Sequence, residues 1–350
     1  KIMVLSEFKP STVQSPLDVD QWIDAYRVSR CIYVIAKLGI ADLLEDGSQH
    51  CDTLAAATNT HSDPLYRVLR FLAAIGIFAE TRPRCFELTP LADSLRSNVP
   101  GSIRSTAIIR GEEYYYKAWE NLMYSVQTGE SAFEHLYGMD LFEYFEQNSV
   151  ARELFHAHAN VYMPKEESAS YLEAYDFSLI SKLVDVGGGT GQLLADVLEA
   201  NPTMKGVLFD LPKVIDQAQD LDELVSVSDR CELIGGSCFE AIPEGGDAYL
   251  LRKVLHLWDD EQAISILKRC YQAMKEQGRL LVIENVVPPG NEFSINKLED
   301  VHMLVMCPGG RERTEGEFQK LFESAGFKLT KIITTKTDLC IIEGVKTAIN

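Results

Sequence analysis

The sequence predicts an α/β fold, in which a seven-stranded, mostly parallel sheet with an antiparallel last strand follows a mostly helical, winged-helix-like region. Strands and helices alternate after residue 180, which is typical of a parallel sheet with helices on both faces. Before that point, apolar residues recur mainly at helical spacing. An apolar strand at residues 183–186 continues into four glycines within residues 187–191. A strand, a glycine turn and a helix let backbone N–H groups approach a ligand closely, so they predict a nucleotide-like binding site.

The first hundred residues are expected to form helices and one hairpin. Helical spacing occurs at residues 18–38, 53–57, 63–75 and 91–94, and the hairpin strands are expected at 77–79 and 85–88. Helices followed by a hairpin make a winged-helix unit, but this one has no stripe of lysine and arginine to bind DNA. We therefore expect it to mediate dimerisation or to cover a substrate, because a fold does not determine its function.

Long amphipathic stretches connect the two halves of the chain, at residues 102–127, 139–147 and 150–162. They are rich in aromatic side chains, among them Tyr114 and Phe145, which suit either a flat aromatic substrate or a helical core. The predicted organisation is therefore a winged-helix-like domain at 1–100, a helical linker and substrate-pocket region at 101–180, and a catalytic domain at 181–350.

The strands of the second half can be placed by their apolar runs. They are expected at residues 183–186, 206–209, 231–234, 248–251, 279–283, 328–333 and 339–343. The last two are too close together for a crossover helix, so they are expected to pair antiparallel.

Composition excludes several classes of partner. The 350 residues carry a formal net charge of −19, which repels phosphate backbones and anionic lipid, so we expect neither nucleic acid nor a membrane surface as a partner. The eight cysteines show no C-x-x-C pair and no zinc-ligand spacing. This pattern predicts reduced thiols, no metal and a cytoplasmic location.

The spacing of the glycines argues against a dinucleotide. Gly187, Gly189 and Gly191 form G-x-G-x-G, whereas a dinucleotide fingerprint has its third glycine one residue later, where this chain has Gln192. No Gly-Lys-Ser/Thr follows, so a P-loop is excluded as well. Asp210 ends the next strand, at about the distance where an acid accepts hydrogen bonds from ribose hydroxyls. An ordinary tight turn would explain the glycines but not this acid.

Four motifs together carry a family resemblance. They are DVGGGTG at 185–191, FDLP at 209–212, LHLWDDE at 255–261 and PGGRERT at 308–314. In this order and spacing the chain resembles the S-adenosylmethionine-dependent O-methyltransferases of small molecules, which include caffeic acid, flavonoid, acetylserotonin and bacterial polyketide enzymes. The resemblance covers nearly the whole chain. It implies a class I methyltransferase Rossmann-like sheet, an N-terminal dimerisation domain and a homodimer.

The resemblance implies a general base and two flanking acids. Methyl transfer to a phenol, whose pKa is about 10, needs a positioned base of pKa nearer 7. His256 follows the strand at 248–251 and matches the family's base, although a histidine there by itself could also be a satisfied core residue. Glu284 and Glu312 match the acids that hold the base in its correct tautomer.

The resemblance also assigns contacts to the cofactor S-adenosylmethionine and to an acceptor. Gly187 would meet the methionine end and Asp210 would bind the ribose, and Asp185 and Gly189 also belong to the cofactor site. The remaining cofactor residues are Leu211, Ser237, Cys238 and Phe239 around the adenine, and Arg252 nearby. The acceptor pocket would be lined by Trp258, Met303 and Met306, although apolar residues at helical spacing also suit a core.

Two departures from the family pattern concern the site. Ser237 stands where the family commonly has an aspartate that accepts from the adenine amino group, and Leu257 stands where it commonly has Asp or Asn. Because the base and its acids are present, methyl transfer to a hydroxyl is the leading hypothesis. We expect this hydroxyl to be a phenolic one on a small aromatic or polyketide-type secondary metabolite.

Three other functions stay open at this point. The departures suit a relative that uses the cofactor without methylating, as a decarboxylase, hydroxylase or pericyclase. A winged-helix regulator that senses a small molecule would bind DNA in a salt-dependent way. A nicotinamide oxidoreductase is disfavoured by the glycine spacing.

Overall fold

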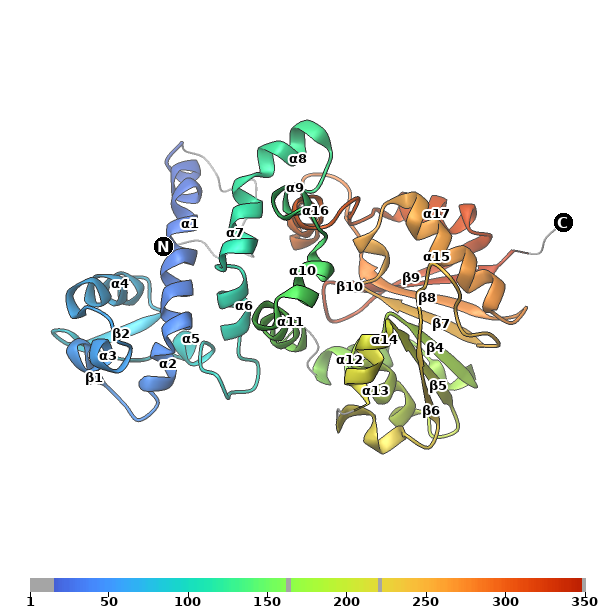
Figure 1. Cartoon of the computed structure of the whole chain (residues 1–350), viewed down its shortest axis with the longest axis horizontal. Coiled ribbons are helices and arrows are strands. Elements are labelled where there is room, and N and C mark those ends of the chain that lie inside the picture. Colours follow the sequence, from blue (N-terminus) through green and yellow to red (C-terminus); the bar gives the residue numbers. More distant parts are fainter. Residues whose placement is uncertain (1–15, 162–164, 220–221, 348–350) are drawn as a thin grey trace. The chain divides into compact units, whose positions relative to one another are not determined.

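The computed structural model describes residues 16–161, 165–219 and 222–347, and the chain divides into two compact units (Figure 1). The first unit holds residues 1–120 and 142–162, and the second holds 121–141 and 163–350. Each unit draws on two separate stretches of chain, which is a different kind of division from three consecutive domains. The predicted domain boundaries at 100 and 180 stay a prediction. None of the helices that the structure describes is long and apolar enough to cross a membrane.

The first unit begins with a helix and a small winged-helix-like sheet. Strands β1 (Gln49–His50), β2 (Phe78–Arg82) and β3 (Cys85–Leu88) pair in the order β1-β3-β2. The helices of this part are α1 (Pro16–Leu38), α2 (Ile40–Leu43), α3 (Cys51–Ala57), α4 (Ser62–Ala74) and α5 (Pro90–Asp93). Leu69, Phe78 and Phe86 lie in one buried core, which unites a helix with both hairpin strands. The predicted hairpin is confirmed, whereas the two-residue strand β1 was too short to be predicted.

The long amphipathic stretches are broken into shorter helices. They form α6 (Arg104–Ile109), α7 (Glu113–Glu120), α10 (Leu141–Gln147) and α11 (Ser149–Val161). Gly111 lies between α6 and α7, and a Cβ there would lie 2.1 Å from the ring of Tyr33 on α1, so only glycine fits at this position. Aromatic rings pack within the unit, with centroid distances of 5.2 Å for Tyr114 and Tyr144 and 4.7 Å for Phe145 and Phe155. These rings therefore serve a helical core in this unit.

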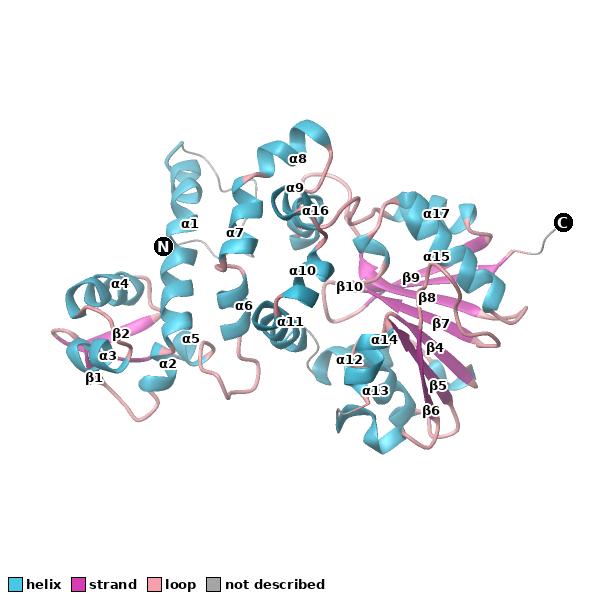
Figure 2. Ribbon diagram, viewed as in Figure 1, coloured by secondary structure: helices cyan, strands magenta, loops and turns pink. Residues whose placement is uncertain are grey.

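The second unit is built on the predicted seven-stranded sheet (Figure 2). Its strands are β4 (Lys182–Val186), β5 (Lys205–Asp210), β6 (Cys231–Gly235), β7 (Ala248–Arg252), β8 (Arg279–Asn285), β9 (Phe327–Thr334) and β10 (Leu339–Lys346). The spatial order is β6-β5-β4-β7-β8-β10-β9, so β10 lies antiparallel between β8 and β9. The predicted antiparallel pairing of the last two strands is confirmed.

Helices cover both faces of this sheet. Successive residues of β4 belong to two different cores. Val184 shares one buried core with Phe318 of α17 (Glu315–Ser324), and Leu183 shares the other with Leu194 of α13 (Gln192–Ala200). A strand buried on both faces is apolar throughout, which is why the runs were recognisable in the sequence. The helices α15 (Asp260–Ala273) and α17 belong to the first core, and α12 (Lys165–Ala174), α13 and α14 (Pro212–Ala218) to the second.

Three helices of this unit do not come from predicted helical stretches. They are α9 (Ala132–Tyr137), α12, and α16 (Ile295–Met306), and α8 (Leu122–Thr128) leads into the first of them. The hydroxyl of Ser131, which caps α9, donates to the carbonyl of Val305 at 3.0 Å and so joins α9 to the end of α16. This contact fixes the segment that precedes the loop containing Glu312.

Candidate active site

The glycine turn after β4 adopts a backbone that only glycine takes easily. Gly187, Gly189 and Gly191 have φ values of 73°, 59° and 82°, in the left-handed region that L side chains rarely enter. A Cβ at Gly187 would lie 2.7 Å from Val254, and one at Gly188 would lie 2.6 Å from an oxygen of Asp185. The turn therefore packs closely against residues at the ends of β4 and β7, and α13 starts directly after it.

Two carboxylates converge on this turn. Asp210 ends β5 and accepts hydrogen bonds from the backbone N–H groups of Gly189, at 2.9 Å, and Leu211, at 2.7 Å. Asp185 is buried, and its Oδ1 has no hydrogen-bond partner among the residues that the structure describes. Burial, with the charge of Asp210 adding to it, raises the pKa of Asp185 to about 7. The strand end thus holds a buried acid with one oxygen that accepts no hydrogen bond from the described residues.

His256 lies at the centre of a second cluster at the same edge of the sheet. It sits on a 3₁₀ turn (Leu255–Leu257) just after β7, and its Nδ1 lies 2.9 Å from Oε1 of Glu312 and 3.8 Å from Oε2 of Glu284. Oε1 of Glu284 accepts the backbone N–H groups of Leu255, at 2.9 Å, and His256, at 3.3 Å. The structure therefore brings together all three residues that were predicted to be catalytic.

Burial makes the charges of this cluster interact strongly. Burial alone would lower the pKa of His256, but the charges of Glu284 and Glu312 and a hydrogen bond from the ring outweigh it and raise the pKa. Burial raises the pKa of Glu284. Burial alone would raise the pKa of Glu312, but the hydrogen bond with His256, the charge of His256 and the hydrogen bond from Asn285 outweigh it and hold the pKa below the usual range. The two acids thus differ: the pKa of Glu312 is lowered, whereas the pKa of Glu284 is raised.

A family model described as an O-methyltransferase domain matches residues 119–328. A second, described as an O-methyltransferase dimerisation domain, matches residues 21–98. The chain belongs to the O-methyltransferase family. It is an S-adenosylmethionine-dependent O-methyltransferase, as its motifs predicted.

Relatives of this methyltransferase support the assignment along its whole length. Phenazine O-methyltransferase PhzM of Lysobacter antibioticus is 42% identical over 92% of this chain and 94% of the relative. The mitomycin biosynthesis 6-O-methyltransferase of Streptomyces lavendulae is 36% identical over 87% of this chain and 86% of the relative. The structure of human N-acetylserotonin methyltransferase in complex with SAM has a TM-score of 0.84 at 25% identity, covering 97% of this chain and 100% of that one. The predicted family and fold are therefore confirmed.

The sheet edge formed by the glycine turn and by Asp185 and Asp210, here called the glycine edge, fits S-adenosylmethionine. The buried Oδ1 of Asp185 without a partner suits a ligand that carries an ammonium group. A Cβ at Gly189 would meet no atom within 4 Å, so the turn is open there. Leu211, next to Asp210, is 49% exposed and offers an apolar surface for a flat ring. These features suit a cationic nucleoside without phosphates.

The other predicted cofactor residues lie at the ends of neighbouring strands. Ser237, Cys238 and Phe239 follow β6, and the Ser237 hydroxyl accepts the N–H of Phe239 at 3.3 Å. The ring of Phe239 packs edge-on against Trp258, with centroids 4.8 Å apart, so a predicted adenine residue and a predicted acceptor residue touch each other. Burial raises the pKa of Cys238 to about 11, which keeps it a thiol. Their contacts with ligands remain predictions.

Arg252 and the two methionines are held within the protein. The Arg252 guanidinium ends β7 and donates to Glu167 of α12 at 2.7 Å, and Tyr171 donates to the same oxygen. Met303 and Met306 lie on α16 with 6% and 0% of their surface exposed, so both pack as core residues in this structure. Their predicted role in the acceptor pocket stays a prediction.

Three residues around the base were not predicted from the sequence. Asn285 donates to Oε1 of Glu312 at 2.9 Å, Asp300 accepts the N–H of Glu312 at 2.9 Å, and Arg313 is buried behind the histidine turn. Asn285 and Arg313 are direct sequence neighbours of the predicted acids, which is the only signal that could have found them. Asp300 lies on α16, and nothing local marks it.

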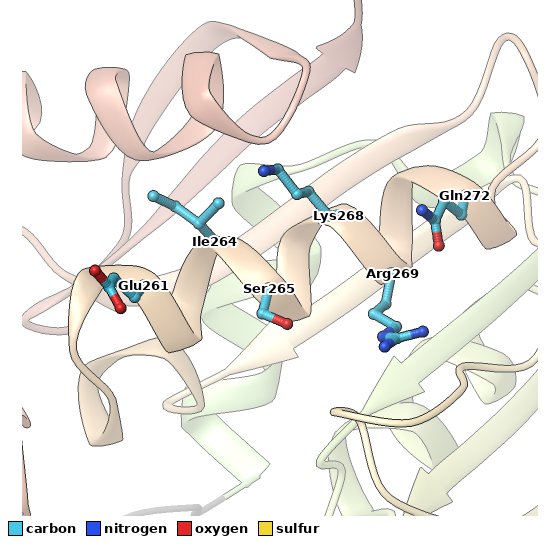
Figure 3. Close-up of a pocket in the computed structure, with 6 residues that line it drawn as sticks. All are labelled: Glu261, Ile264, Ser265, Lys268, Arg269 and Gln272. Atoms are coloured by element: carbon cyan, nitrogen blue, oxygen red, sulfur yellow. The ribbon is translucent and has the colours of Figure 1, made fainter.

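Two further features of the second unit carry no site of their own. A shallow hollow along α15 is lined by Glu261, Ile264, Ser265, Lys268, Arg269 and Gln272 (Figure 3). All six belong to the one helix, and none is a predicted site residue. The ligand atoms of His256, Glu284 and Glu312 lie within 4.8 Å of one another, a spacing that a metal ion could also use. The absence of a metal therefore stays a prediction.

Proposed function

We propose that this methyltransferase transfers the methyl group of S-adenosylmethionine to a hydroxyl, phenolic in character, of a small aromatic or polyketide-type secondary metabolite, with His256 as the general base. The observation that carries the proposal is the pairing of His256 Nδ1 with the ionised Glu312 at 2.9 Å. Two relatives whose names contain phenazine and mitomycin support an acceptor of this class.

The tautomer of His256 follows from its partners. Glu312 favours its ionised form, so it accepts a proton-bearing Nδ1, which leaves the lone pair on Nε2. A neutral imidazole in this tautomer takes the acceptor's proton through Nε2. Such a base contributes about 10²- to 10⁴-fold to the rate. The imidazolium that forms is stabilised by Glu312, as in other histidine–carboxylate pairs.

Glu284 and Glu312 have separate tasks in this proposal. Glu312 accepts from the ring, so it determines the tautomer. Glu284 accepts from the backbone N–H groups of Leu255 and His256, so it holds the turn that carries the ring. Its second oxygen, Oε2, lies 3.8 Å from Nδ1 and adds negative charge beside the imidazolium.

The residues of the glycine edge would hold the cofactor. Bound S-adenosylmethionine supplies an electrophilic methyl group on a sulfonium. Asp185 and the turn at Gly187 and Gly189 would hold its methionine end, and Asp210 its ribose. Leu211, Ser237, Cys238 and Phe239 would surround the adenine, with Arg252 nearby. Ser237 has no charge to offer the adenine amino group, so we expect this contact to be weaker than one made by an aspartate.

A homodimer is part of the proposal. The match to the dimerisation domain supports it, as does an exposed apolar stripe on α1 at helical spacing. The stripe consists of Val19 (48% exposed), Trp22 (44%), Ile23 (64%) and Tyr26 (50%). A stripe of this kind is stabilised when a second copy covers it.

The test is product analysis with the purified enzyme, S-adenosylmethionine and a panel of phenols. We expect S-adenosylhomocysteine and an O-methylated product, and a loss of kcat of about 100-fold or more in His256→Ala. His61→Ala is the matched control, because His61 is exposed and belongs to the first unit. Full activity of His256→Ala would overturn the base. A product methylated at nitrogen would overturn the hydroxyl target, and a cofactor that is bound but not consumed would overturn methyl transfer.

A further inference from the structure

We propose that Arg313 is a positioning residue for methyl transfer, which acts by holding the backbone of the turn that carries His256. Its side chain is 1% exposed and is the largest among the fully buried side chains that the structure describes. A buried arginine is costly unless its donors are satisfied, so its partners reveal what it does.

The guanidinium of Arg313 holds both ends of the histidine turn. Its Nη1 donates to the carbonyl of Leu255 at 2.9 Å, and its Nη2 donates to the carbonyl of Trp258 at 2.9 Å. These carbonyls lie on either side of His256. The Nε donates to Oδ1 of Asp260 at 2.9 Å, and this acid is the only carboxylate among the described residues recorded in an ion pair with Arg313. The side chain therefore connects the turn to the start of α15.

The loop that carries Arg313 also holds the remaining backbone atoms of the turn. The N–H of Arg311 donates to the carbonyl of His256 at 2.9 Å. A Cβ at Gly310 would lie 2.6 Å from the Cβ of Cys307 and 3.1 Å from that carbonyl oxygen, so glycine suits this close approach of the loop. With Glu284 accepting on the other side, the N–H and the C=O of His256 both have partners.

Arg313 and Glu312 are consecutive, which couples the backbone to the ring. Glu312 holds Nδ1 while Arg313 holds the carbonyls of Leu255 and Trp258, so one short segment sets both the tautomer and the position of the imidazole. A displacement of about 1 Å in such a group costs about 100-fold in rate. The charge of Arg313 also favours the ionised form of Glu284.

Lysine cannot replace arginine in this role. A planar guanidinium has five donors in a fixed fork, whereas an ammonium is a compact point charge. Arg313→Lys keeps the charge and loses the simultaneous contact with two carbonyls and one carboxylate. The substitution therefore tests position separately from charge.

The inference rests on the proposed role of His256, and the experiment compares Arg313→Lys, His256→Ala and the control Arg279→Lys. Arg279 starts β8 and donates to the buried Glu343 at 2.8 Å. Arg279→Lys therefore makes the same substitution at an arginine that binds a buried acid away from the base. For Arg313→Lys we expect kcat to fall about 100-fold, with KM for S-adenosylmethionine within about twofold. The ascending limb of the pH profile of kcat/KM should move to lower pH, because a misplaced ring loses the bond to Glu312 that raises its pKa. Arg279→Lys should change only the thermal stability.

The outcomes separate this inference from the proposed function. If His256→Ala is inactive while Arg313→Lys keeps its kcat and pH profile and loses only stability, Arg313 is merely structural and the inference is wrong. If His256→Ala is fully active, the base assignment itself has failed.

If Arg313→Lys does not fold, the variant Asp260→Asn tests the inference instead, because Asp260 is 52% exposed and asparagine keeps an acceptor. For Asp260→Asn we expect kcat to fall about threefold, which corresponds to the energy of a half-exposed ion pair. For the neighbouring variant Glu261→Gln we expect an unchanged kcat. An unchanged kcat in Asp260→Asn would then overturn the inference.

Discussion

Two buried acid clusters lie on the adjacent strands β8 and β10, and they are organised in opposite ways. Glu343 on β10 accepts from the hydroxyls of Tyr175 and Thr330, both at 2.7 Å, and from Arg279 at 2.8 Å, which together hold its pKa below the usual range although burial opposes this. In the His256 cluster, Oε2 of Glu284 and Oε2 of Glu312 accept no hydrogen bond within the described part of the chain. Both oxygens of Glu343 therefore have partners, whereas each acid beside His256 has one oxygen without a partner among the described residues.

The contrast teaches where chemistry can occur in this sheet. A buried carboxylate with all its partners in place stays ionised, and it contributes stability rather than reactivity. In the His256 cluster the pKa of Glu284 is raised by burial, so this acid responds to a proton on its neighbour. The predictions below test whether the two clusters differ in this way.

Glu312→Gln should have the largest effect. An amide oxygen can still accept from Nδ1 and keep the tautomer, but the negative charge beside the imidazolium is lost. We expect kcat to fall about 100-fold, with the ascending limb of kcat/KM at lower pH. Steady-state kinetics across pH measures both. An unchanged limb would show that Glu312 does not control the basicity of His256.

Glu284→Gln should affect activity less and stability in an unusual direction. Its amide oxygen still accepts the backbone N–H groups of the turn, so we expect kcat to fall only about tenfold, which equals one pKa unit of His256 basicity. The pKa of Glu284 is raised in the folded protein, so its stabilising contribution is full below about pH 4, its unfolded value, and is lost as pH rises through the folded value. The variant should therefore gain stability relative to the wild type as pH rises. Urea unfolding at about pH 5 and about pH 8 measures this, and a uniform loss at both would contradict it.

Glu343→Gln should reverse that pattern. The pKa of Glu343 is lowered by its partners, so its contribution is present above about pH 4, the unfolded value, and is lost as pH falls through the folded value. We expect the variant to lose about 2 kcal/mol of unfolding free energy at about pH 7, and progressively less as the medium becomes more acidic. Its kcat should match that of the wild type. A large loss of kcat would mean that the two clusters are coupled.

Tyr175→Phe should give the smallest change. It removes one hydrogen bond to Glu343 and leaves Thr330 and Arg279 in place. We expect a loss of about 1 kcal/mol in unfolding free energy and no change in kcat or its pH profile. Denaturant melts beside an activity assay measure both. A loss as large as that of Glu343→Gln would show that the phenol, and not the whole set of partners, stabilises the acid.

Much of the sheet could be predicted because its strands are buried on both faces. Apolar runs such as 183–186 and 248–251 mark such strands, and the short gap before 339–343 predicted antiparallel pairing. The position of β10 between β8 and β9 could not be predicted in the same way, since strand order depends on contacts far apart in the chain. The helices α9, α12 and α16 were missed because short segments with mixed polarity do not show a clear period.

The sequence alone determined the class of chemistry: four ordered motifs, a glycine turn followed by Asp210, and a histidine with two acids. These signals are local or depend on residue type, so they survive without coordinates. Only the tertiary structure decided how the acids divide their work and that Arg313 is buried behind His256. The reason is that His256 and the Arg313 side chain lie 28 to 58 residues away from their hydrogen-bond partners, and burial, which sets the pKa of each group, depends on how distant segments pack.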